Sequence, residues 1–104
     1  MNSHKYMVKS LLELARTKQD AVFKLQCLLE AIEETAILIF KIKDNNPKYK
    51  DEVMKYIKNE KELYSIYSRV IDETFNYIIN GEFDEGLIND VEKAVLRRLD
   101  YYED

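Results

Sequence analysis

Apolar positions recur along the first part of this chain at the spacing of an α-helix. They are separated by four and three residues in turn, and one polar residue interrupts the series. The series consists of Leu11, Ala15, Lys18, Val22, Leu25, Leu29, Ile32, Ala36 and Ile39. This spacing predicts one helix over residues 3–43, about 60 Å long at the usual rise per residue.

A polar gap within that series leaves an alternative open. Thr17, Lys18, Gln19 and Asp20 are consecutive, and they include residue types that cap helices. If the helix breaks there, its first segment folds back as a fourth helix of the same chain.

A second helix is predicted from the turn at residues 44–46 to Gly81. Asn46 is placed as its N-cap and Pro47 as its first residue. Its apolar side chains form one broad arc when successive residues are rotated by about 100°. The arc consists of Tyr49, Val53, Tyr56, Leu63, Tyr64, Tyr67, Val70, Ile71, Phe75 and Ile78.

Two further local signals shape the second half of the chain. Asn59 and Glu62 match a capping box, so a break near residue 59 is an alternative to one continuous helix. Asp84 is a suitable N-cap for a last helix over residues 85–102, with Phe83 and Ile88 spaced as a hydrophobic staple.

Together these signals predict an all-α fold, a long antiparallel hairpin with a shorter third helix. The antiparallel register places Lys18 opposite Asp72. The third helix is too short to cover the turn end of the hairpin, where residues 36–42 are apolar on almost every side. We therefore expect a homodimer that completes a helical bundle at that end. The expected interface consists of Ile37, Leu38, Phe40, Ile42, Tyr49, Val53, Tyr56 and Ile57.

Composition agrees with one globular domain over residues 1–104. The chain is 46% hydrophobic and 35% charged, and no stretch approaches the length of a membrane span. The N-terminal residues lack a signal-peptide core, so we expect a cytoplasmic protein without a membrane partner. Cys27 is the only cysteine, which excludes an internal disulfide, and its apolar neighbours predict burial.

Charge is unevenly distributed along the chain. Residues 62–104 contain eleven acidic and four basic side chains, a net charge of −7, whereas the net charge of residues 1–43 is +2. The acidic part would repel nucleic-acid phosphates and suits a basic protein partner.

The sequence predicts no catalytic residue, no cofactor and no metal site. His4 is the only histidine, so neither a nucleophilic triad nor a di-iron Glu-x-x-His pair is possible. There is also no glycine-rich loop to hold phosphate. Glu30, Glu33 and Glu60 remain candidates for a cation site.

One short motif resembles part of a known family. Glu30, Glu33 and Glu34 are similar to the Glu-x-x-Glu half-site of the all-α nucleotide pyrophosphohydrolases related to MazG. The resemblance implies a magnesium-dependent enzyme. The second half-site is imperfect, because the residue three positions after Glu73 is Asn76, where the family has an acid. In the predicted register, such a site requires carboxylates from two chains.

We expect a non-catalytic interaction module, an adaptor or a small subunit of a larger assembly. The alternatives are that pyrophosphohydrolase-like enzyme and a nucleic-acid-associated accessory protein.

Overall fold

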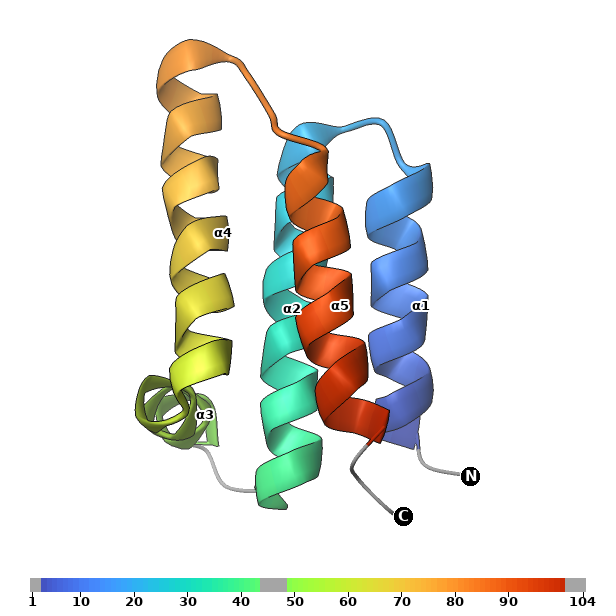
Figure 1. Ribbon diagram of the computed structural model, residues 1–104, viewed down its shortest axis with the longest axis vertical. Helices are drawn as coiled ribbons and strands as arrows, with labels where there is room; N and C mark the ends of the chain where they lie inside the picture. Colours follow the sequence, from blue (N-terminus) through green and yellow to red (C-terminus); the bar gives the residue numbers. More distant parts are fainter. Residues whose placement is uncertain (1–2, 44–48, 101–104) are drawn as a thin grey trace.

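The computed structural model describes residues 3–43 and 49–100, and all secondary structure in these residues is helical (Figure 1). The all-α prediction is therefore confirmed. The helices are α1 (Ser3–Thr17), α2 (Ala21–Phe40), α3 (Tyr49–Asn59), α4 (Lys61–Asn80) and α5 (Gly86–Asp100).

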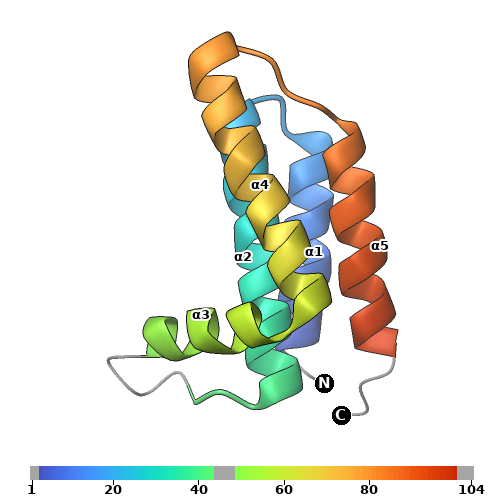
Figure 2. The same ribbon diagram turned by 60° about the vertical axis from the view of Figure 1, so that its left-hand side comes forward.

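Four of the helices form a bundle, and α3 lies across one end of it (Figures 1 and 2). Helix α2 is at the centre and contacts each of the other described helices. This position explains why the last residues of α2, from Ala36 to Phe40, are apolar on almost every side, since α2 buries residues against neighbours in several directions. None of the described helices is both long and apolar enough to cross a membrane.

The prediction of one helix over residues 3–43 is wrong, and the alternative with a break holds. Residues 18–20 form a loop, after which the carboxylate of Asp20 accepts a hydrogen bond of 3.1 Å from the amide of Val22 and caps α2. Helix α1 folds back on α2 and buries Val8, Leu12 and Ala15. Because Lys18 lies exposed in this loop, it forms no register pair with Asp72 among the described residues.

The second predicted helix is also divided, at Glu60. The carboxylate of Glu60 accepts a hydrogen bond of 2.6 Å from the amide of Leu63, so Glu60 is the N-cap of α4. Asn59 is not the cap, because its side-chain amide donates instead to the carbonyl of Lys55. The alternative of a break near residue 59 is confirmed, and the cap lies one residue further on.

Two predicted boundaries agree with the structure. Gly81 ends α4 with a φ of 72°, a backbone conformation that glycine adopts without strain, and its amide donates to the carbonyl of Tyr77. Asp84 accepts a hydrogen bond of 2.9 Å from the amide of Gly86 and begins α5. The predicted cap Asn46, Pro47 and residues 101–102 lie outside the described part of the chain.

Candidate protein-binding surface

The predicted interface residues do not form an uncovered apolar end. Ile37, Leu38 and Ile42 are buried within this chain, as are Val53 and Ile57 of α3. The predicted interface assumed that no segment of the chain covers this end of the hairpin. That assumption is wrong, because α1 folds back beside α2 and α3 lies across this end of the bundle. Cys27 is buried as predicted, and burial raises the pKa of its thiol.

Two other predicted interface residues lie at the edge of this region. The rings of Phe40 and Tyr56 stack with centroids 5.0 Å apart and an interplanar angle of 19°, which joins the end of α2 to α3. The side chain of Tyr49 lies outside the described residues. The aromatic pair therefore contributes to packing within the chain.

The largest exposed apolar side chains of α4 are at the opposite end of the bundle. Phe75 is 59% exposed, Ile78 68% and Ile79 76%. Tyr64 is also exposed and Ile71 is half-buried. We call Tyr64, Ile71, Phe75, Ile78 and Ile79 the α4 stripe.

The stripe arises from a second apolar face on one helix. The core face of α4 includes Leu63, Ile66 and Val70, which pack against the rest of the bundle. Tyr64 follows Leu63, and Ile71 follows Val70, so each is rotated about 100° from the core face. Helix α4 thus carries more apolar surface than its neighbours α2, α3 and α5 cover.

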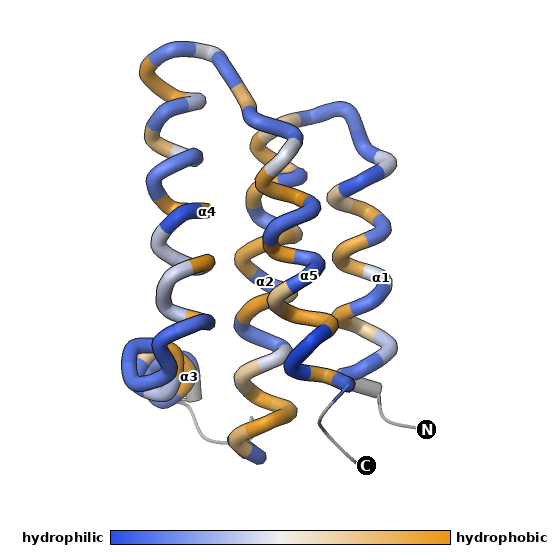
Figure 3. Tube along the Cα trace, in the orientation of Figure 1, coloured by the Kyte–Doolittle hydropathy of each residue, from blue (hydrophilic) through white to orange (hydrophobic). Residues whose placement is uncertain are grey.

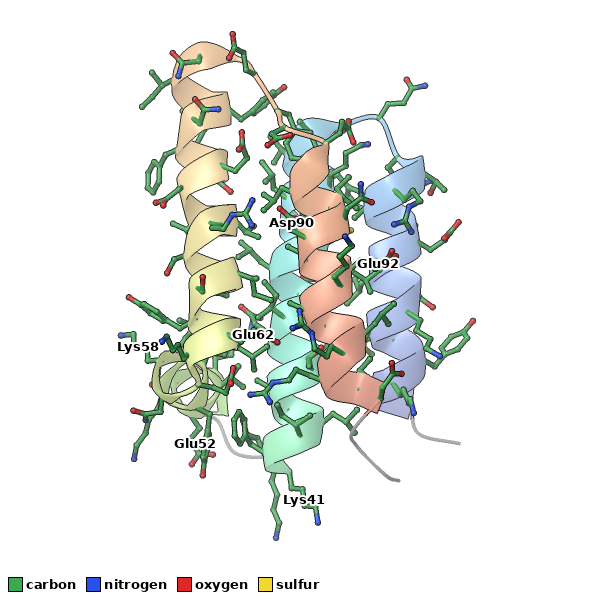
Figure 4. The ribbon with its side chains drawn as sticks, in the orientation of Figure 1. Lys41, Glu52, Lys58, Glu62, Asp90 and Glu92 are labelled. Carbon is green, nitrogen blue, oxygen red and sulfur yellow. The ribbon has the colours of Figure 1, made fainter. Side chains whose placement is uncertain are left out.

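The third side of α4 is polar and faces α5. Arg69 lies 2.9 Å from Asp90, and Arg97 lies 3.5 Å from Glu62. Figure 4 shows Glu62 and Asp90 in the space between these two helices. These ion pairs leave the α4 stripe on a different side of the helix.

Helix α3 borders the lower part of the stripe. A shallow pocket of about 260 Å³ lies between the two helices, lined by Met54, Lys58, Tyr64, Tyr67, Ser68, Ile71 and Asp72. The carboxyl end of α4 rises above the loop that joins α1 and α2 in both views (Figures 1 and 2). Figure 3 shows apolar stretches on this raised end. Val22 and Phe23, which are also exposed, begin α2 at the same end of the bundle.

The surroundings of the raised end are acidic. Residues 70–92 contain no lysine, arginine or histidine but seven acids, namely Asp72, Glu73, Glu82, Asp84, Glu85, Asp90 and Glu92. Three of these acids pair with basic residues from elsewhere in the chain. Within the described residues, the carboxylates of Asp72 and Glu82 have no ion-pair partner. The last turn of α4 also lacks a basic residue to offset the negative end of its dipole.

The glutamates of the family-like motif line a separate pocket of about 350 Å³. Glu30, Glu33 and Glu34 of α2 face Lys50 and Asp51 of α3 there. Burial raises the pKa of the Glu33 carboxyl above its ordinary value; Lys50 opposes this rise, and Glu30 and Glu34 add to it. Burial and the nearby Glu33 likewise raise the pKa of Tyr67.

These carboxylates do not assemble into the candidate cation site. Glu60 instead caps α4 and pairs with Arg98. Glu73 of the imperfect second half-site accepts a hydrogen bond from Asn76 on α4 itself. No group of three histidine, cysteine or acidic residues in the described ranges is arranged to hold a metal ion.

Comparisons with known proteins give no family for this chain. No family model, no curated protein and no solved structure matches it.

Proposed function

We propose that this chain is a non-catalytic helical module that binds another protein through the α4 stripe. The observation that carries the proposal is the exposure of Phe75, Ile78 and Ile79 together on a helix whose core face is already packed. Large contiguous apolar surfaces on soluble domains commonly mark interaction sites. Covering a large apolar side chain on binding contributes up to about 1.5–3 kcal/mol before the costs of association.

The completeness of the core supports this interpretation. Leu25, Leu28 and Ile32 of α2 are fully buried, as are Leu63 of α4 and Leu99 of α5. The bundle therefore does not require a second chain to bury its centre. Removing the stripe side chains should affect binding far more than folding.

The alternative functions lack a supporting observation. The glutamates near Lys50 are not arranged as a metal site within the described residues. An acidic surface beside the stripe disfavours a nucleic-acid backbone. A protein partner agrees with both the apolar and the acidic character of this end.

The proposal is tested by co-isolation from the cells in which the chain occurs. The stripe variant combines Ile78→Gln and Ile79→Gln, which remove apolar surface without adding charge. The matched control combines Ser65→Gln and Asn89→Gln, at exposed positions of α4 and α5 outside the stripe. A polypeptide retained by wild type and control but lost from the stripe variant supports the proposal. Identical sets of retained polypeptides for all three proteins would contradict it.

A further inference from the structure

We infer that the occupant of the α4 stripe is a basic amphipathic helix of a partner protein. This inference rests on the proposed function and adds the chemistry of the partner. It draws on three properties of the same surface, namely its linear shape, the charge beside it and the consequences of pairing it with itself.

The shape of the stripe favours a helix. Tyr64, Ile71 and Ile78 recur at intervals of seven residues along α4, and Phe75 lies between the last two. From Tyr64 to Ile78 the stripe extends about 21 Å at the rise of an α-helix. A straight row of this period matches the apolar face of a second helix, which presents its own side chains at the same repeat.

The charge beside the stripe favours a basic partner. Asp72 lines the pocket next to Ile71 together with Lys58, so the excess of negative charge lies towards the end of α4, which Glu82 follows. The last carbonyls of α4 add the negative end of the helix dipole, with no basic residue of that turn to offset it. Lysine or arginine side chains flanking the apolar face of a partner helix would complement all three features.

A second copy of this chain is a poorer occupant. Antiparallel two-fold pairing through the middle of the stripe would bring Asp72 close to Asp72 of the other copy, since residues near the axis of an isologous interface meet their own counterparts. Like charges brought together at an interface oppose association.

The inference is tested by titrating labelled peptides against the full chain and following fluorescence anisotropy. The probe is a helical leucine and lysine peptide of about 18 residues, long enough to span the stripe. One control peptide carries glutamate in place of lysine, and another has the same leucine and lysine content without an apolar face. We expect the amphipathic basic peptide to bind at least about tenfold more tightly than either control, and less tightly at high salt.

Protein variants then locate the binding. Ile78→Gln with Ile79→Gln should weaken binding of the basic peptide about tenfold or more, because the apolar contact is lost. Asp72→Asn with Glu82→Gln should weaken it about threefold to tenfold and reduce its salt dependence. Ser65→Gln with Asn89→Gln should leave the affinity within about twofold. Circular dichroism and a thermal melt confirm that each variant is folded.

Several outcomes overturn the inference, and they differ from failure of the proposed function. Equal binding of the basic and acidic peptides would show that charge does not select the partner. Equal binding of the basic peptide to the stripe variant and the control variant would show general electrostatic adhesion. A dimer in light scattering that Ile78→Gln dissociates would make a second copy the occupant. In each case the co-isolation experiment still decides whether the stripe binds a protein.

Discussion

The ammonium of Lys24 lies 3.2 Å from both carboxylate oxygens of Glu85, which joins the beginning of α2 to the segment that leads into α5. Lys24 is buried, whereas the side chain of Glu85 is 65% exposed. The Nζ atom of Lys24 also lies 6.0 Å from the centre of the Phe83 ring. These contacts hold the connection after Gly81 against the bundle, beneath the raised end of α4.

Removing the acid from this pair should destabilise the fold more than removing the base. Glu85→Gln leaves a buried ammonium without its counter-charge, and we expect a loss of about 1–2 kcal/mol in the free energy of unfolding. Lys24→Met removes the buried charge and keeps most of the packing volume, so it should cost less. Urea unfolding followed by circular dichroism measures both. A larger loss for Lys24→Met than for Glu85→Gln would be inconsistent with this explanation.

Glu60 has two roles that should appear together in one variant. Its carboxylate caps α4 and also pairs with Arg98, whose Nε is buried and has no hydrogen-bond partner among the described residues. Glu60→Ala should therefore lower the free energy of unfolding by about 1–2 kcal/mol. The control is Glu62→Ala, which removes an exposed pair with Arg97 and should cost less than about 0.5 kcal/mol. Equal losses in urea unfolding would exclude a special role for Glu60.

The raised pKa of Glu33 predicts a pH-dependent effect of its charge. Because burial makes the folded state bind this proton more tightly than the unfolded chain does, the contribution of Glu33 to stability is greatest below the ordinary pKa of 4.5. That contribution is lost as pH rises through the raised pKa. Glu33→Gln should thus raise the melting temperature at neutral pH.

The advantage of Glu33→Gln over wild type should shrink as pH falls below 4.5. Thermal melts of both proteins across this range test the prediction, and Glu13→Gln on the exposed face of α1 is the control. A variant that melts below wild type at neutral pH would contradict the burial of this charge.

The α4 stripe should contribute little to stability. Ile78→Gln with Ile79→Gln should change the free energy of unfolding by less than about 0.5 kcal/mol, because both side chains are already exposed. Ile66→Ala removes a buried side chain from the same helix and should cost about 2–5 kcal/mol. If Ile78→Gln with Ile79→Gln lowered the free energy of unfolding as much as Ile66→Ala does, the stripe would be part of the core.

Local signals in the sequence predicted much of the fold. Asp84 and Gly81 act at helix ends as their residue types suggest, through a side-chain acceptor and a left-handed backbone conformation. The apolar series from Leu11 to Ile39 was misleading because its spacing continues across residues 18–20. The loop of residues 18–20 has a length that keeps the spacing of four and three residues, so the series is compatible with two helices as well as with one.

The binding surface was harder to predict for a physical reason. The broad apolar arc, which includes Leu63, Phe75 and Ile78, was evident in the sequence, but its width does not show which side chains another helix covers. That depends on where α2 and α3 pack against α4. Once α1 folds back, the expected bare end around Ile37 is covered, and the exposed apolar surface lies instead at Phe75 and Ile78.

Site-specific photo-crosslinking in the cells in which the chain occurs tests whether the α4 stripe contacts another protein. A photoreactive residue replaces Phe75 in the stripe, Tyr56 at the other end of the bundle, or Asn89 on α5. We expect a crosslink to another polypeptide from position 75 that disappears when Ile78→Gln and Ile79→Gln are added, and no crosslink from position 89. Crosslinks from position 56 and none from position 75 would contradict this expectation.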